Sequence, residues 1–189
     1  MALQEAAEHL RALQAEQATF TEQRDRKKSS KQEDVIYHQW ATFKVDNELY
    51  GVDVIQVKEV LRYSEITPVP GADSYILGII NLRGNVVTVI DTRRLFGLMS
   101  NEPDDDTRVI VVEYNENEVV GLVVDNVDEV INIPQKSVDR APNLAGDEST
   151  KKFVQGVCYH QGILTILLDL PKMLQSVTPV DASSSDDLF

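Results

Sequence analysis

Few side chains in this sequence have the types and the spacing that catalysis requires. The three histidines, His9, His38 and His160, share no metal-ligand spacing with one another or with the single cysteine, Cys158. Cys158 lies in an apolar run, where a buried packing thiol is expected and a nucleophile is not. We therefore expect no metal ion, no cofactor and no catalytic cysteine.

The glycines and the clustered carboxylates do not match known binding loops either. Gly71, Gly78 and Gly84 lack the spacing and the Lys-Ser/Thr ending of a phosphate-binding loop, and the sequence has no Gly-x-Ser-x-Gly motif. The run Asp104–Asp106 lacks the alternating ligand spacing and the downstream glutamate of a calcium-binding loop. We interpret that run as a solvated connection.

Three further carboxylates, Asp53, Asp91 and Asp169, are candidates for acid–base catalysis. Each precedes a short segment with helical spacing, and Asp91 and Asp169 occupy matching positions of an internal repeat. Helix capping therefore explains them better. The sequence predicts a protein that is not an enzyme, and a β-barrel enzyme that uses Asp53 or Asp91 is the competing hypothesis.

An internal repeat sets the positions of these residues. Gly51 pairs with Gly121 at a numbering offset of 70 (121 − 51). A second block has a numbering offset of 78 (156 − 78) and pairs Gly78 with Gly156, Gly84 with Gly162, and Asp91 with Asp169. A repeat of this length is one folding unit used twice. Residues that recur in both halves are those that folding needs, and exposed residues that differ are free to carry function.

Each unit is predicted to consist of short strands. Hairpin turns are expected at Asp46-Asn47 and Asn115–Asn117, and tight tips at Arg83–Asn85 and His160–Gly162, because Asn, Asp and Gly tolerate positive φ. The segment Val54–Leu61 is predicted to be a short amphipathic helix. A sheet this small can hide its edges only by curling, so we expect two small β-barrels packed against each other.

Composition restricts the partners of the protein. The 189 residues carry a net charge of −13, all of it in residues 34–189, because Lys/Arg and Asp/Glu balance in residues 1–33. An acidic body repels phosphate backbones and anionic lipids, so neither nucleic-acid binding nor direct membrane insertion is expected. No apolar run approaches the roughly 20 residues that span a bilayer. The first residues do not resemble a signal peptide, and a single cysteine suits a reducing compartment. We expect a soluble, cytoplasmic protein.

Three segments are predicted along the chain. Residues 1–34 form an N-terminal extension, partly helical or disordered, with a basic linker; it is either a mobile tail or a docking helix. Residues 35–176 form the folded domain, with units of roughly 38–97 and 108–174 that exchange strands. Residues 177–189 form a disordered acidic tail.

The comparison of the two halves singles out Arg83. The first hairpin tip reads Asn81-Leu82-Arg83-Gly84, and the matching tip reads Tyr159-His160-Gln161-Gly162. Folding therefore retains the glycine and not the arginine. A cation on a rigid hairpin suits a partner's carboxylate, and the alternative is that Arg83 only keeps the hairpin soluble.

Four valines behave in the opposite way, because they recur in both halves. Val57 and Val60 correspond to Val127 and Val130. Packing in the core is the simpler interpretation. The alternative is that some of them line an apolar seam between the barrels, where a partner helix would bind.

Several blocks of the sequence resemble the CheW-like family of chemotaxis coupling adaptors. They are Tyr50–Val54, Glu59-Val60, Pro68, Gly78–Gly84, Val89–Asp91 and Gly121–Asp125. The Asn-Leu-Arg-Gly hairpin, followed by a valine strand and an aspartate, is a specific motif, and the resemblance covers about residues 36–176. The chain has no room for the further domains that accompany CheW-like domains in the CheA kinase and the CheV adaptors. The resemblance therefore implies a stand-alone adaptor of a two-component system.

The resemblance implies a mainly β fold of two intertwined, five-stranded β-barrels with short helices, internally duplicated. It also implies two binding surfaces. One is a groove between the barrels for the cytoplasmic tip of a methyl-accepting chemoreceptor, and the other is a barrel end for the regulatory domain of a CheA-type histidine kinase. The positions similar to the family's partner contacts are Val57, Glu59, Gly78, Asn81, Arg83, Val86, Val127 and Val130.

The implied function is that of a non-enzymatic adaptor without cofactors. It would let chemoreceptors control kinase autophosphorylation in arrays at the inner membrane, with a position at the cell pole expected. Ring contacts between copies of the adaptor are a further expectation. Two alternatives are an adaptor of another chemosensory or surface-motility pathway, and a scaffold that positions proteins through residues 1–34.

Overall fold

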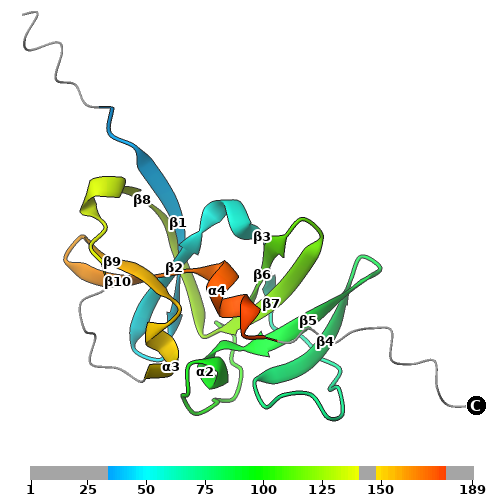
Figure 1. Ribbon diagram of the computed structural model, residues 1–189. Helices are drawn as coiled ribbons and strands as arrows, with labels where there is room; N and C mark the ends of the chain where they lie inside the picture. Colours follow the sequence, from blue (N-terminus) through cyan, green and yellow to red (C-terminus); the bar gives the residue numbers. More distant parts are fainter. Residues whose placement is uncertain (1–33, 141–147, 178–189) are drawn as a thin grey trace, which may run out of the picture. The chain divides into compact units, whose positions relative to one another are not determined.

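The computed structural model describes residues 34–140 and 148–177 (Figure 1). The chain divides into two units, Met1–Ile36 and Tyr37–Phe189, and the fold that follows is that of the second unit. Residues 1–33 of the predicted N-terminal extension and residues 178–189 of the predicted tail lie outside the described residues. Val177 is buried in the core, so packed structure extends one residue past the predicted boundary at 176.

Short strands dominate the described residues. The strands are β1 (Tyr37–Val45), β2 (Glu48–Asp53), β3 (Val57–Arg62), β4 (Ile76–Leu82), β5 (Asn85–Asp91), β6 (Arg108–Asn115), β7 (Glu118–Val124), β8 (Asn126–Pro134), β9 (Val154–His160) and β10 (Ile163–Leu168). The helical segments are η1 (Val54–Gln56), α2 (Thr92–Leu95), η2 (Gln135–Ser137), α3 (Glu148–Lys151) and α4 (Leu170–Gln175). Within the described ranges, no helix has the length and apolar character needed to cross a bilayer.

The strands form two five-stranded sheets, designated sheet A and sheet B. Sheet A has the order β8-β1-β2-β10-β9, and sheet B has the order β3-β6-β7-β5-β4. In each sheet a hairpin of one repeat (β1–β2 or β6–β7) lies beside three strands of the other repeat. The predicted mainly β fold of two intertwined, five-stranded units is confirmed.

The pairing register carries the internal duplication. β2 runs parallel to β10 with Gly51 opposite Leu167, and β7 runs parallel to β5 with Gly121 opposite Val89. The two glycine numbers differ by 70 (121 − 51) and the numbers of their partners by 78 (167 − 89), which are the two offsets found in the sequence. A Cβ at Gly51 would lie 3.1 Å from the Leu167 side chain, and a Cβ at Gly121 would lie 2.8 Å from the Val109 side chain. Both copies of the repeat therefore favour glycine, which has no side chain, at this position.

An isolated bridge joins the two edges of each sheet. Thr67, after β3, pairs with Ile79 of β4, and Asp139, after β8, pairs with Val157 of β9. Each bridge has two backbone hydrogen bonds of 2.9–3.0 Å. The bridges provide hydrogen-bond partners for some of the backbone groups on the open edge strands, and they close each sheet toward a barrel. Gly78 permits this approach, because a Cβ at that position would lie 2.0 Å from the Thr67 carbonyl oxygen.

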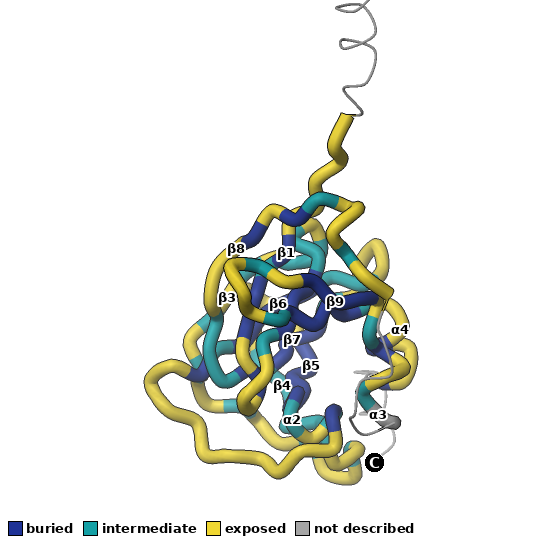
Figure 2. Tube along the Cα trace, turned by 90° about the vertical axis from the view of Figure 1, so that its left-hand side faces the viewer, coloured by how far each residue is buried: buried dark blue, intermediate teal, exposed yellow. Residues whose placement is uncertain are grey.

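The main hydrophobic core lies between the two sheets. It takes Phe43 and Tyr50 from sheet A and Ile90 and Leu122 from sheet B, together with fifteen further buried residues. A second cluster, which includes Trp40, belongs to sheet A. Figure 2 shows buried residues along the strands and exposed residues in the long connections. Burial of apolar surface contributes about 25 cal/mol per Å², so the shared core is the main force that holds the sheets together.

The prediction of a helix at Val54–Leu61 is wrong. Only Val54–Gln56 forms a helical turn, and β3 follows at once, paired with β6. Residues in β3 alternate between half-buried and exposed, as in a strand with one face on the core. The segment is rich in β-branched residues, and pairing with a distant strand decides its conformation.

The other local predictions are confirmed. The four predicted turns lie where expected, between β1 and β2, β6 and β7, β4 and β5, and β9 and β10. Asp91 caps α2 by accepting hydrogen bonds from the Arg93 and Arg94 N–H groups, and Asp169 caps α4 by accepting one from the Lys172 N–H. Asp53 accepts a hydrogen bond from the Ile55 N–H, so it caps a helix as predicted, although that helix is a single 3-10 turn.

Candidate functional site

The eight residues predicted to contact partners lie on edge strands and at a hairpin tip. β3 carries Val57 and Glu59 at one edge of sheet B, and β4 carries Gly78 and Asn81 at the other edge. Arg83 forms the β4–β5 tip, with Val86 at the start of β5. Val127 and Val130 lie on β8, an edge strand of sheet A.

Arg83 forms a two-pronged ion pair with Glu59. Two guanidinium nitrogens of Arg83 lie 3.3 and 3.0 Å from the two carboxylate oxygens of Glu59. The pair links the β4–β5 tip to β3, which is the far edge strand of the same sheet. The Arg83 side chain is 78% exposed and that of Glu59 is 23% exposed, so the guanidinium covers the carboxylate and stays largely in solvent. The cation expected to meet a partner's carboxylate thus already binds one in its own chain.

Asn81 and Gly84 shape the hairpin tip that carries Arg83. The Asn81 side chain accepts a hydrogen bond of 2.9 Å from the Gly84 N–H, which fixes the tip. Arg83 itself has a φ of 51°, and Gln161, at the matching tip, has a φ of 50°. Both tips therefore have the same backbone conformation, and the difference between them is one of side chains.

The valines divide into two kinds. Val57 and Val127 are half-buried and pack against the core between the sheets. Val60 is 45% exposed and Val130 is 50% exposed, so the expectation that they pack in the core is wrong. Val86 is also largely exposed, unlike the buried residues that follow it in β5. These exposed β-branched residues, on the edge strands β3 and β8 and at the start of the interior strand β5, are suited to contact another molecule.

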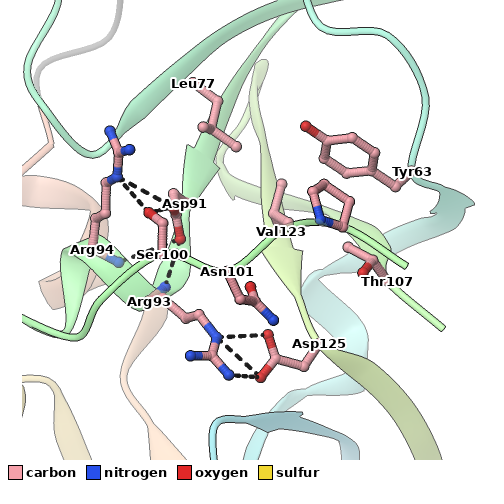
Figure 3. Close-up of a pocket in the computed structure, with 11 residues that line it drawn as sticks. Tyr63, Leu77, Asp91, Arg93, Arg94, Ser100, Asn101, Thr107, Val123 and Asp125 are labelled. Atoms are coloured by element: carbon pink, nitrogen blue, oxygen red, sulfur yellow. Dashed lines mark hydrogen bonds and ion pairs between the residues drawn. The ribbon is translucent and has the colours of Figure 1, made fainter. Parts of the chain in front are cut away.

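A small cavity lies at the other end of sheet B, where β5 and β7 end (Figure 3). Its volume is about 150 Å³, and Tyr63, Leu77 and Val123 form its apolar side. The charged side contains Arg93 and Asp125. The Arg93 side chain donates three hydrogen bonds to Asp125, with distances of 2.7, 2.9 and 3.1 Å.

The carboxylates near this cavity already have partners. Asp91 accepts hydrogen bonds from the N–H groups of Arg93 and Arg94 and from the Ser100 hydroxyl group. The hydrogen bonds from Arg93 to Asp125, together with nearby carboxylates, raise the pKa of Arg93 above its ordinary value. These contacts fit structural roles in capping and ion pairing.

The other residues considered for chemistry are equally consistent with structural roles. Cys158 is fully buried, and desolvation raises the pKa of its thiol, which disfavours the reactive thiolate. Among the described residues, no group of three or more His, Cys, Asp or Glu side chains is placed to hold a metal ion.

The sequence pattern did not predict that Arg83 pairs with Glu59 or that Arg93 pairs with Asp125. Glu59 and Arg83 meet only because the edges of sheet B approach each other, and no local pattern encodes that approach. Asp125 did carry a signal. It corresponds to Ile55 at the first repeat offset (125 − 55), so folding of the repeat does not need a carboxylate at that position.

Known proteins of one family resemble this chain over most of its described residues. A family model described as the CheW-like domain matches residues 39–178. The chain is 32% identical to the chemotaxis protein CheW of Klebsiella aerogenes over 143 residues, which cover 76% of this chain and 85% of that protein. It is 35% identical to the CheW of Bacillus subtilis over 125 residues, covering 66% of this chain and 80% of that protein.

A solved structure has the same fold. The crystal structure of the scaffolding protein TtCheW from Thermoanaerobacter tengcongensis superimposes with a TM-score of 0.67 and 33% sequence identity, covering 74% of this chain and 94% of that one. The family model, the relatives and the solved structure agree on one conclusion. The chain belongs to the CheW-like family.

Proposed function

We propose that this protein is a non-enzymatic chemotaxis adaptor that couples chemoreceptors to a CheA-type histidine kinase. It binds the cytoplasmic tips of the receptors and the regulatory domain of the kinase in arrays at the inner membrane. Family membership supports the adaptor role. The observation that carries the proposal is the exposed Arg83–Glu59 pair, which joins the β4–β5 tip to the edge strand β3.

An adaptor that performs no chemistry can change kinase output only by binding. It must bind the active and inactive kinase conformations unequally, and the receptor state must bias that preference. Each contact can be modest, since a micromolar dissociation constant corresponds to about −8 kcal/mol. Many linked contacts in an array then add avidity, and ring contacts between copies of the adaptor would increase it further.

The proposed surface combines charge and apolar area. Arg83 offers a largely solvated guanidinium whose orientation the Glu59 carboxylate fixes, so less side-chain entropy is lost on binding. Val60 on β3 and Val86 at the start of β5 provide exposed apolar area on sheet B, and Val130 on β8 provides it on sheet A. Because the β9–β10 tip has Gln161 where the β4–β5 tip has Arg83, we expect only the β4–β5 tip to bind a partner's carboxylate.

A binding experiment with two partner fragments tests the proposal. The full chain is titrated calorimetrically with a soluble receptor-tip fragment and, separately, with the isolated regulatory domain of the kinase. We expect Arg83→Glu to weaken binding of at least one fragment by about tenfold, or ~1.4 kcal/mol. Gln161→Glu is the control at the repeat-related tip, where Gln161 has nearly the same φ; it changes the net charge by one unit, whereas Arg83→Glu changes it by two.

Two results would contradict this function. Absence of binding to both fragments by the unaltered protein would exclude the adaptor role for these partners. Equal weakening by Arg83→Glu and Gln161→Glu would show that the effect comes from net charge and not from the Arg83 tip. An adaptor of a surface-motility pathway is the second candidate, and it would bind a kinase of that pathway in a pull-down from cells and not the chemotaxis kinase.

A further inference from the structure

The chain crosses between the two sheets twice, at positions related by the repeat. The first crossing runs from β2 to β3 through Asp53–Val57, and the second runs from β7 to β8 through Val123–Val127. The two stretches correspond residue by residue at the first repeat offset (123 − 53). Any difference between the crossings is therefore not required by the repeated fold.

A cluster of charged residues holds the second crossing at Asp125. The Asp125 carboxylate accepts three hydrogen bonds from Arg93, which lies on α2 directly after β5 of sheet B (Figure 3). It also accepts a hydrogen bond of 2.7 Å from the Asp46 N–H in the β1–β2 turn of sheet A, and its own N–H donates to the Lys44 carbonyl oxygen at 3.0 Å. One residue thus connects elements of both sheets.

Among the described residues, the first crossing has no such connection. The residue that corresponds to Asp125 is Ile55, which is 82% exposed. The hydrogen bond that Asp53 accepts comes from within its own turn, from the Ile55 N–H. The repeated unit therefore folds around an unbraced crossing in one copy, and the Arg93–Asp125 contact is an addition to the other copy.

The geometry makes this contact strong. The side chains of Arg93 and Asp125 are 17% and 22% exposed, so solvent screens the pair less than it screens surface ion pairs. A fork-to-carboxylate arrangement fixes both the distance and the plane of the two groups. The second Asp46 contact, 3.4 Å from the Arg93 guanidinium to the Asp46 carboxylate, adds to the constraint.

The strand that begins at this point carries part of the proposed partner surface. β8 starts at Asn126, with Val127 and Val130 following, and it lies at the edge of sheet A beside β1. The β1–β8 pairing also shifts register between Ala41 and Phe43, opposite Val130 and Val127. The start of β8 is thus an edge segment whose ladder with β1 is interrupted between Val127 and Val130, where the Thr42 hydroxyl group exchanges two hydrogen bonds with the Glu129 backbone. Asp125 fixes the chain directly before this segment.

We propose that Arg93, Asp125 and Asp46 act as positioning residues that hold the start of β8 in its binding conformation and so set the affinity for the partner that β8 contacts. This inference rests on the proposed function, because it assumes that β8 binds a partner. The three residues do not need to touch that partner. They act through the position of Val127 and Val130.

The test compares binding and local protection in matched variants of the full chain. Val130→Glu first identifies which fragment, receptor tip or kinase regulatory domain, depends on β8. Arg93→Met removes the guanidinium fork and is expected to weaken binding of that same fragment by about fivefold. Amide hydrogen exchange at residues 126–130 should accelerate by about tenfold, with little change in sheet B. Arg93→Lys, which keeps the charge but not the fork, should restore part of both effects.

Lys172→Met is the control, because Lys172 corresponds to Arg94 on the repeat-related helix α4 and pairs with the helix cap Asp169. It should leave binding within about twofold of the unaltered protein. Unchanged affinity and unchanged exchange at β8 in Arg93→Met would overturn the inference, as would equal acceleration of exchange throughout both sheets. If the unaltered protein binds neither fragment, the proposed function fails, whereas the exchange measurement still decides whether Arg93 holds β8.

Discussion

At the scale of the residue, Arg83 has one contact within the chain, with Glu59, and one proposed contact with a partner. Its ion pair with Glu59 is bidentate, but the side chain of Arg83 remains 78% exposed. Exposed ion pairs contribute little to stability, with a median of about 0–1 kcal/mol. The position is therefore better explained by binding than by folding.

Exchanging the two charges separates these roles. The double variant Glu59→Arg/Arg83→Glu retains an ion pair but moves the cation from the exposed tip to the more buried strand. We expect its free energy of unfolding, measured by urea denaturation, to lie within about 1 kcal/mol of that of the unaltered protein. We also expect it to bind the partner fragments as weakly as Arg83→Glu alone. Recovery of binding in the double variant would instead show that the ion pair matters in either orientation, and that a cation at position 83 is not required.

The raised pKa of the buried Tyr50 makes the stability of the fold depend on pH in the alkaline range. Burial, followed by the charges of Glu48 and Asp46, raises the pKa of Tyr50 to about 12 from an ordinary 10.0. The unfolded chain loses this proton first, so the contribution is fully present below pH ~10 and is lost as the pH rises toward ~12. Two pKa units correspond to a loss of about 2–3 kcal/mol.

The variant Tyr50→Phe should lack this component. Its free energy of unfolding should fall less than that of the unaltered protein between pH 9 and pH 11.5, by about 1–2 kcal/mol, when both are measured by urea denaturation. Parallel pH profiles for the two proteins would mean that Tyr50 ionises in the folded state as it does in the unfolded state.

At the scale of the element, the closure of sheet B depends on Gly78 in β4. Gly78 has a φ of 149°, and a Cβ there would lie 2.0 Å from a backbone oxygen, which cannot move as a side chain would. We expect Gly78→Ala to destabilise the fold by about 3 kcal/mol or more, from overpacking and backbone strain together. Gly78, proposed as a partner contact from the family resemblance, would then affect binding through the fold.

Gly84→Ala is the control for this substitution. Gly84 also has a positive φ, 86°, but a Cβ at that position would meet nothing within 4 Å. Its cost should be only that of the backbone conformation, about 1 kcal/mol. Equal urea midpoints for the two variants would contradict the role given to the Thr67–Ile79 bridge.

The elements show what a sequence can and cannot specify. Turns and helix caps are encoded within a few residues, and for this reason Asp91, Asp169 and the hairpin tips are predicted correctly. The strand β3 is mistaken for a helix, because its apolar spacing fits both and its pairing with β6 lies far along the chain. The comparison of the two halves shows that folding does not need an arginine at position 83, and its place at a hairpin tip predicts its exposure. Its pairing with Glu59 depends on the closure of the sheet.

At the scale of the whole molecule, the exchange of strands between repeats ties the two halves together. Each sheet needs a hairpin from one half and three strands from the other. A chain cut in the exposed loop after Asp105 should therefore give two fragments that each lack a cooperative unfolding transition. Mixing the fragments should restore the transition, as followed by circular dichroism. Independent folding of either fragment would contradict the intertwined arrangement.

The most direct measurement of the central claim is kinase autophosphorylation in a reconstituted array. Receptors in vesicles and the CheA-type kinase are assayed with and without this protein, and with its Arg83→Glu variant. The account predicts that receptor state changes the autophosphorylation rate only when the unaltered protein is present. It also predicts that Arg83→Glu abolishes this control while lowering the free energy of unfolding by only about 1 kcal/mol, through loss of the Glu59 ion pair. Receptor control that is equally strong without the protein, or with the variant, would contradict the claim that it acts as the link between the two.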